Sequence, residues 1–480
     1  MLFNSVAFFA FFAVVYAIYV PASTRLQNLV LLLASYVFYG AWDWRFLGLL
    51  ALSTLIDYRC AQAIEDDDPT RRRRWLLLSL ISNLGILATF KYFNFFVASF
   101  AALCDALGLP VATTTLDIVL PVGISFYTFQ TMGYTIDVYR GRMPASRDLT
   151  VFALYVAYFP QLVAGPIERA THLLPQLAAD RHITYARLRD GAWLILLGLF
   201  KKVVVADNMA RIVDPVFGGD GTYSGATALL AVYAFALQIY ADFSGYTDIA
   251  RGVSKLLGIE LMRNFRRPYF ATDPREFWQR WHISLSQWLR DYLYITLGGN
   301  RGGRWRQYRN LMLTMLLGGL WHGASWMYVI WGAIHGALLV LHRSWLHLVG
   351  ERGLPGLMHH LPPLLRGLLL FHLVCLAWIF FRARTLEGAG TMLAAITTDL
   401  SFSPADWSTV TLMFVCAGPL LGLDLWEEQH ERRHGAPAAD ALPFVFTAPA
   451  PMRGLLYALL LLYIAVVGAP AGVEFIYFQF

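Results

Sequence analysis

The chain has 480 residues, of which 57% are hydrophobic and only 15% are charged. Soluble domains carry about 25% charged residues, so the composition excludes a string of soluble globular domains. The net charge of +6 is modest and gives no indication of a nucleic-acid partner. Since no long polar region interrupts the apolar pattern, residues 1–480 are predicted to form a single integral membrane domain.

The apolar runs predict an all-α, polytopic membrane protein with about 11–13 transmembrane helices, because each crossing needs about 20 mostly apolar residues. The first run lacks a basic region and a small-residue cleavage site, so we expect a retained helix and not a signal peptide. The run at 150–166 ends in FPQLVAGPI and is too interrupted to cross. In chain order, the candidate spans centre on residues 5–20, 26–41, 46–58, 75–97, 116–136, 191–206, 226–246, 310–323, 325–341, 364–381, 408–425 and 454–470.

Basic residues orient the predicted spans, because cytoplasmic loops are enriched in Lys and Arg. The four arginines at 71–74 are the strongest local signal, and they are predicted to face the cytoplasm. Residues 98–115 contain no Lys or Arg and are then predicted to face outside. Further along, residues 139–147 return to the cytoplasm.

The most basic stretch is 251–309, with twelve Lys or Arg residues against four Asp or Glu residues. Within it, FWQRWHISLSQWLRDYLYI carries aromatic and basic residues at helical spacing, which predicts an amphipathic helix at the inner interface. Topology alone explains this charge as well as a docking surface for an anionic donor does. Under the second interpretation, Arg266 and Arg267 are the candidate donor-binding residues.

Three histidines fall inside apolar runs: His322, His335 and His372. An ionisable residue within a membrane span indicates function, although a structural hydrogen bond explains His372 better because it has no polar neighbours in sequence. For His335, the structural and functional interpretations are evenly balanced. It lies 13 residues after His322, over about 90° away on a continuous helix, and is therefore expected to lie outside the site.

His322 is the strongest catalytic candidate, since glycines surround it in LGGLWHGASW and Trp321 precedes it. Small residues permit close helix packing, so the pattern is typical of a narrow tunnel wall with Trp321 as a substrate contact. A histidine with an ordinary pKa near 6.5 accepts a proton near physiological pH. Such a group serves as a general base.

Two further candidates accompany it. His282, in RWHISL, is the second catalytic candidate, and a water-facing interface histidine is the alternative. Asp242, in ADFSGYTDIARG, is placed to orient a base or bind substrate, or equally to cap a helix. The four cysteines are scattered without a CxxC pair, which favours buried thiols over a disulfide or a metal site.

Five motifs together resemble the membrane-bound O-acyltransferase family and, within it, the branch that O-acetylates alginate. The resemblance covers essentially the whole chain. It implies many transmembrane helices around a funnel, with re-entrant and interfacial helices, and acyl transfer from a thioester to a hydroxyl. The family's catalytic histidine corresponds to His322 and its second signature position to His282. The motifs are FPQLVAGPI (159–167), YADFSGYTDIARG (240–252), NFRRPYFATDPREFWQRWHISLSQWLRDYLYITLGGNRGG (264–303), LGGLWHGASWMYVIWGAIHG (317–336) and FIYFQF (475–480).

The resemblance implies a multi-pass acetyltransferase of the bacterial inner membrane. The expected donor is cytoplasmic acetyl-CoA or another acyl thioester, and no permanently bound cofactor or metal is expected. Hydroxyls of an alginate-like exopolysaccharide are the expected acceptor, with His322 as general base and with membrane lipid and periplasmic acetyltransferase proteins as partners. Cellulose, peptidoglycan or a lipid are alternative acceptors. A transporter of small molecules or lipids is a further alternative, although no internal repeat is visible.

Overall fold

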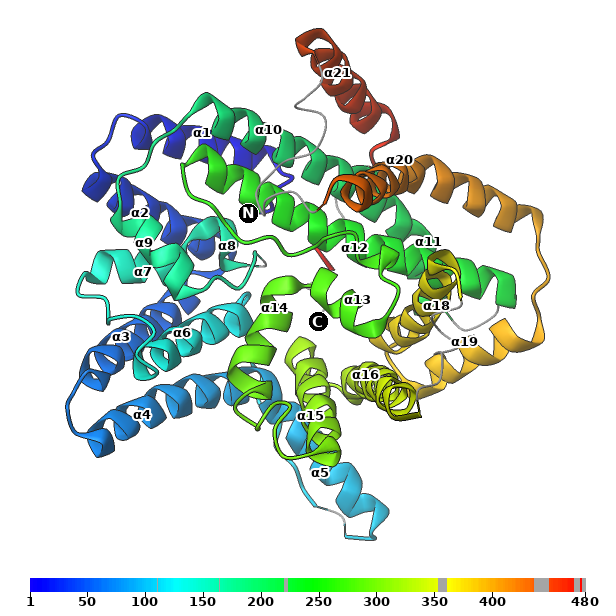
Figure 1. Ribbon diagram of the computed structural model, residues 1–480, viewed down its shortest axis with the longest axis horizontal. Helices are drawn as coiled ribbons and strands as arrows, with labels where there is room; N and C mark the ends of the chain where they lie inside the picture. Colours follow the sequence, from blue (N-terminus) through cyan, green and yellow to red (C-terminus); the bar gives the residue numbers. More distant parts are fainter. Residues whose placement is uncertain are drawn as a thin grey trace. The chain divides into compact units, whose positions relative to one another are not determined.

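The computed structural model describes residues 1–109, 111–163, 165–219, 223–352, 361–435, 449–469 and 475–476, and gives only the backbone of residues 350–352 (Figure 1). Ala164 of the FPQLVAGPI motif and residues 477–480 of the terminal FIYFQF motif therefore lie outside the described residues. Every regular element in the described part of the chain is a helix. The predicted all-α fold is confirmed.

The described chain forms two compact units, and the first comprises residues 1–191, 250–262 and 323–325. Helix α10 (Tyr185–Leu199) and helix α12 (Gly225–Leu256) each contribute residues to both units. The other helices of the first unit are α1 (Val6–Tyr19), α2 (Thr24–Asp43), α3 (Phe46–Ile64), α4 (Pro69–Leu87), η1 (Ala88–Tyr92), α5 (Phe93–Ala106), α6 (Ile124–Tyr139), α7 (Leu149–Ala157), α8 (Phe159–Leu162) and α9 (Ala170–Ala178).

The second unit comprises residues 192–249, 263–322 and 326–480, and it contains all the predicted site residues. Whether the two units make up the single membrane domain that we expected stays a prediction. The helices of this unit are η2 (Phe200–Ala206), α11 (Asp207–Gly218), η3 (Pro268–Phe270), α13 (Pro274–Arg280), α14 (Ile283–Trp288), η4 (Leu289–Tyr294), α15 (Arg304–His322), α16 (Trp326–Arg352), α18 (Pro363–Arg382), α19 (Leu386–Thr398), α20 (Pro404–His434) and α21 (Ala450–Val467).

Within the described residues, six helices are long and apolar enough to cross a membrane, which supports a polytopic membrane protein. The helix that begins at Pro69 runs to Ala106 and contains the whole predicted span at 75–97. The count of about 11–13 crossings stays a prediction. The six are Pro69–Ala106, Gly225–Leu256, Trp326–Val349, Pro363–Arg382, Pro404–His434 and Ala450–Val467.

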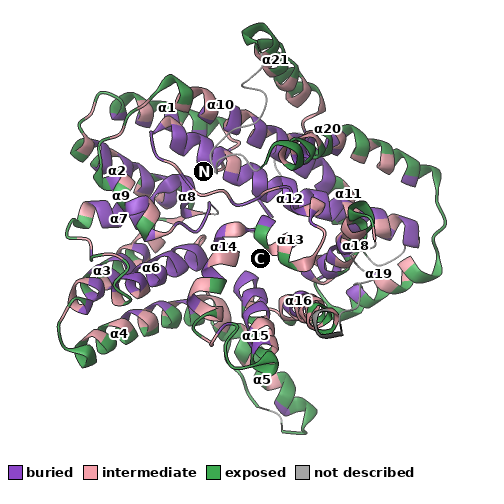
Figure 2. Ribbon diagram, viewed as in Figure 1, coloured by how far each residue is buried: buried purple, intermediate pink, exposed green. Residues whose placement is uncertain are grey.

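These spans differ in what surrounds them. The apolar window of α12 is 83% buried within the protein, whereas that of α20 is only 22% buried. Figure 2 shows the contrast, with α12 mostly buried and α20 and α21 largely exposed. Exposed apolar surface of this extent marks a membrane-facing protein, and α12 instead forms part of the protein interior.

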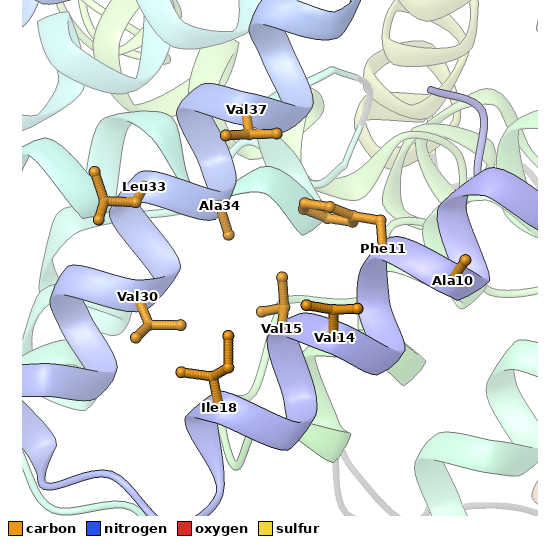
Figure 3. Close-up of a pocket in the computed structure, with 9 residues that line it drawn as sticks. All are labelled: Ala10, Phe11, Val14, Val15, Ile18, Val30, Leu33, Ala34 and Val37. Carbon is orange, nitrogen blue, oxygen red and sulfur yellow. The ribbon is translucent and has the colours of Figure 1, made fainter.

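A groove between α1 and α2 also suits a lipid environment (Figure 3). Its volume is about 570 Å³, and all nine residues that line it are apolar. Val14 and Leu33, for example, are exposed, and hydrocarbon solvates such side chains better than water does.

Candidate functional site

His322 is the last residue of α15. Residues Gly323–Ser325 are not helical and connect it to α16, which begins at Trp326. The two helices pack closely, because a Cβ on Gly319 would lie 2.2 Å from the backbone oxygen of Tyr328. The continuous helix that we assumed between His322 and His335 is therefore wrong. The two histidines lie on different helices, and their angular separation along one helix carries no information.

Three of the predicted residues come together in this unit. The rings of His322 and His282 have centroids 6.3 Å apart, and the Trp321 ring lies 5.0 Å from His322 and 5.9 Å from His282. His322 is 6% exposed and His282 is fully buried, which excludes the water-facing alternative for His282. The two imidazoles and the indole of Trp321 are packed against one another and form a compact site with little access for water.

The predicted amphipathic helix around His282 is also wrong. Helix α13 ends at Arg280 and α14 begins at Ile283, while His282 has φ +41° in the left-handed region. Both residues at the break, Trp281 and His282, are buried. The segment therefore enters the protein interior, whereas an amphipathic helix at the membrane interface would keep one face in water. A non-glycine residue with positive φ is uncommon and is found at functional sites.

Asn264, which was not among the residues predicted from the sequence, fixes this break. Its backbone oxygen accepts from the Ile283 N–H at 2.9 Å. Its side-chain oxygen accepts from the Ser284 hydroxyl at 2.8 Å and lies 3.3 Å from His282 Nδ1. An amide oxygen is an acceptor, so Nδ1 carries the proton and Nε2 is the acceptor nitrogen of the ring. Burial lowers the pKa of His282 to about 3, so the imidazole is neutral.

His335 lies in the same group of packed aromatic rings as His322, and its exclusion from the catalytic site stays a prediction. The Trp331 ring lies 5.1 Å from His322 and 4.8 Å from His335. His335 is also stacked on Phe277, with ring centroids 5.8 Å apart. Among the described residues, its buried Nε2 has no hydrogen-bond partner. The Trp331 ring thus lies in contact with both histidines.

His372 has the structural hydrogen bonds that its sequence context predicted. Its Nδ1 lies 2.7 Å from the Leu368 backbone oxygen, and its Nε2 lies 2.9 Å from the Tyr233 hydroxyl. Both ring nitrogens are thus engaged within the protein.

Asp242 lies in the middle of α12 and is buried, so it does not cap a helix. Lys202 Nζ lies 2.9 Å from Asp242 Oδ1 and 2.9 Å from Asp207 Oδ1. Asp242 Oδ2 accepts from the Ile476 N–H at 2.8 Å. The carboxylate thus holds the backbone at Ile476, and substrate contact by Asp242 stays a prediction.

The held segment packs toward His282. Phe475 stacks on Tyr246 with ring centroids 4.4 Å apart and lies 6.3 Å from Phe243. Phe243 in turn makes an edge contact with His282 at 4.8 Å. The buried ion pair of Asp242 is therefore two aromatic contacts away from the site, which suits a positioning role.

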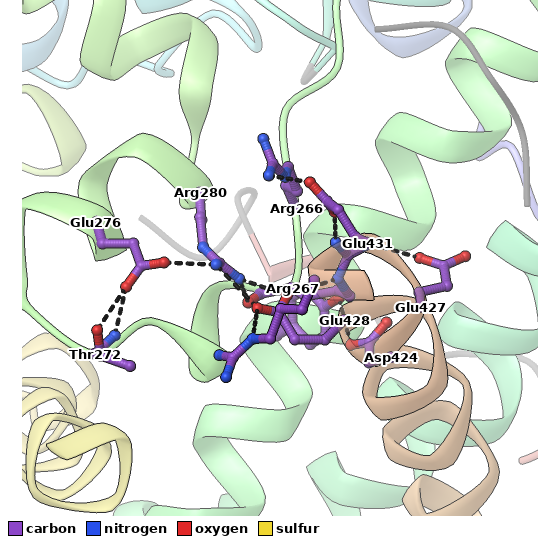
Figure 4. Close-up of polar contacts among 11 residues, drawn as sticks. Arg266, Arg267, Thr272, Glu276, Arg280, Asp424, Glu427, Glu428 and Glu431 are labelled. Carbon is purple, nitrogen blue, oxygen red and sulfur yellow. Dashed lines mark hydrogen bonds and ion pairs between the residues drawn. The ribbon is translucent and has the colours of Figure 1, made fainter. Parts of the chain in front are cut away.

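Arg266 and Arg267 have partners that the sequence did not indicate (Figure 4). Arg267 is 4% exposed and pairs with Glu427 at 2.9 Å, with Glu428 at 3.1 Å and with Glu431. Arg266 is more exposed and also pairs with Glu431. A donor that contacts Arg267 has to compete with three carboxylates of α20. Donor binding by this pair stays a prediction.

The described part of the chain offers no group of three or more His, Cys, Asp or Glu side chains arranged to hold a metal ion. The four cysteines are buried, as the sequence predicted.

Comparison with known proteins identifies the class. Residues 146–381 match the model of the MBOAT, membrane-bound O-acyltransferase family. The chain is 43% identical to a probable alginate O-acetylase AlgI of Azotobacter vinelandii, over 85% of this chain and 79% of that protein. It is 37% identical to a peptidoglycan O-acetyltransferase of Helicobacter pylori, over 81% and 78%, and 30% identical to a teichoic acid D-alanyltransferase of Streptococcus thermophilus, over 47% and 57%. The chain belongs to the membrane-bound O-acyltransferase family and is a multi-pass membrane O-acyltransferase.

Proposed function

We propose that this O-acyltransferase moves an acetyl group from a cytoplasmic thioester donor toward hydroxyls of an exopolysaccharide on the periplasmic side of a bacterial inner membrane, with His322 as general base. The carrying observation is the buried pair of imidazoles, His322 and His282, with ring centroids 6.3 Å apart beside Trp321. Relatives named for alginate, peptidoglycan and teichoic acid support a polymer acceptor.

In this mechanism His322 takes the proton of the acceptor hydroxyl while the hydroxyl oxygen attacks the thioester carbonyl. A C–O bond forms, the C–S bond breaks, and the thiolate leaves with the bonding electron pair. A positively charged neighbour would oppose the charge that His322 gains, but His282 is neutral because it is buried. The enclosed aromatic walls limit competing hydrolysis.

Replacing His322 with Ala tests the base. We expect acetylation to fall by about 10² to 10⁴, the contribution of a positioned general base. The measurement is the acetyl content of secreted polymer in a deletion strain that expresses each variant, with membrane levels checked by immunoblot. His372→Gln is the matched control, since it removes an intramembrane histidine whose partners, Tyr233 and Leu368, lie outside the His322 cluster. Near-normal acetylation with His322→Ala at normal protein levels would remove the base assignment.

Donor and acceptor are tested together with purified protein in lipid nanodiscs and a labelled acetyl thioester. We propose acetyl-CoA or another acyl thioester as donor and an alginate-like polymer as acceptor, reached directly or through periplasmic acetyltransferase proteins. Peptidoglycan is the second candidate acceptor, because a relative named for it is 37% identical over most of the chain; cellulose and lipids serve as further acceptor arms. Transfer of label to peptidoglycan and not to alginate would make peptidoglycan the preferred acceptor. Uptake of label into sealed proteoliposomes without transfer to any acceptor would favour a transporter.

The proposed orientation places Arg71–Arg74 in the cytoplasm and residues 98–115 outside, because only the former loop is basic. A Thr113→Cys variant is expected to react with an impermeant thiol reagent in intact cells. Labelling of this cysteine only after the membrane is permeabilised would show that the protein has the opposite orientation.

A further inference from the structure

A second cavity, distinct from the histidine cluster, opens between the segment 266–280, the start of α18 and the end of α20. Its volume is about 420 Å³. Four arginines line it, Arg266, Arg280, Arg366 and Arg432, together with three glutamates. Both α18 and α20 are candidate membrane spans, so the cavity lies where two spanning helices end.

The three lining glutamates are already neutralised within the protein (Figure 4). Glu428 pairs with Arg280 at 2.8 Å and with Arg267 at 3.1 Å. Glu276 pairs with Arg280 at 2.5 Å. Glu431 pairs with Arg266 and Arg267. No carboxylate of the cavity is left to attract a cation.

The arginines exceed the carboxylates by one. Beside the cavity, Arg267 and Glu427 form an ion pair at 2.9 Å, and including them gives five arginines against four glutamates. The excess charge belongs to Arg366, because its guanidinium forms no hydrogen bond or ion pair with any described residue, and its buried Nε has no partner there. The buried Nε of Arg266 also has no partner among the described residues.

We propose that this cavity binds a phosphate group, held chiefly by Arg366 and by the Nε of Arg266. A guanidinium is a planar fork of donors that matches phosphate oxygens, and a buried charged donor without a partner is costly. The net positive charge disfavours a cation, and the polar lining disfavours an acyl chain. Two sources present a phosphate at a membrane surface: an acidic phospholipid headgroup and the phosphates of a coenzyme A thioester. The second source rests on the proposed donor.

Binding to the full chain in nanodiscs tests the proposal without any acyl transfer, so its outcome is independent of His322. In one arm, coenzyme A is titrated into protein in phosphatidylcholine nanodiscs by calorimetry. In the other, protein exchanged into nanodiscs containing phosphatidylglycerol is released, and retained lipid is counted by native mass spectrometry. Arg366→Gln is expected to weaken one of the two by about tenfold or more, as loss of a charge-assisted hydrogen bond does.

Arg433→Gln is the matched control, because it removes an exposed arginine one residue from Arg432 that does not line the cavity. Loss confined to coenzyme A assigns the cavity to a soluble phosphate ligand, and loss confined to phosphatidylglycerol assigns it to a lipid. The proposal is overturned if Arg366→Gln, with an unchanged unfolding temperature, leaves both unaltered, or if Arg433→Gln weakens binding equally.

Discussion

Lys202 offers a sharp test of what the buried charges contribute. It lies between two buried carboxylates, at 2.9 Å from Asp207 and 2.9 Å from Asp242. Removing one partner of a buried ion pair costs about 3–5 kcal/mol, because the remaining charge is uncompensated. Lys202→Met leaves two such carboxylates, so we expect a cost at the upper end of that range. Asp242→Asn leaves Lys202 paired with Asp207, and the amide oxygen can still accept from Ile476, so we expect only about 1–3 kcal/mol.

The four buried cysteines supply the assay, since a thiol-reactive fluorescent dye labels them only as the detergent-solubilised protein unfolds. We expect the unfolding midpoint to be highest for the wild type, lower for Asp242→Asn and lowest for Lys202→Met. Arg147→Gln is the control, because the Arg147 side chain in its pair with Glu65 is 71% exposed and ion pairs at the surface contribute at most about 1 kcal/mol. If Lys202→Met destabilises no more than Asp242→Asn, Lys202 does not hold both carboxylates, and the reasoning fails.

Two further predictions concern the packing around His322. Gly319→Ala would place a Cβ 2.2 Å from the Tyr328 backbone oxygen, so we expect α15 and α16 to separate. Gly318→Ala is the control, because its Cβ meets only the flexible Leu289 side chain at 3.1 Å. We expect Gly319→Ala to show lower polymer acetylation and a lower unfolding midpoint than Gly318→Ala. Equal behaviour of the two glycine variants would argue against this close approach. His335→Ala leaves a cavity beside Trp331, with a cost of about 2–5 kcal/mol for such truncations, and is expected to lower polymer acetylation, whereas His335→Phe keeps a ring there and restores most of it. If Phe is no better than Ala, the imidazole acts through its nitrogens and not through packing.

The all-α membrane class follows from the sequence alone, since hydrophobicity is a local property of windows of about 20 residues. The sequence also singled out His322, His282 and Trp321, because polar and small residues within apolar runs stand out without knowledge of the fold. These three residues lie together in the structure. Their local context was sufficient to select them, though not to show how they meet.

The geometry of the site and the partners of its charged residues depend on how the chain folds. The left-handed conformation of His282 is held by contacts of its neighbours with Asn264, and the helical periodicity of the sequence gave no sign of it. Arg267 was interpreted as a donor contact because its neighbours in sequence are basic, yet its ion pair with Glu428 joins residues 161 positions apart. Charge compensation acts through space over a few ångströms, and sequence distance does not reveal which charges meet.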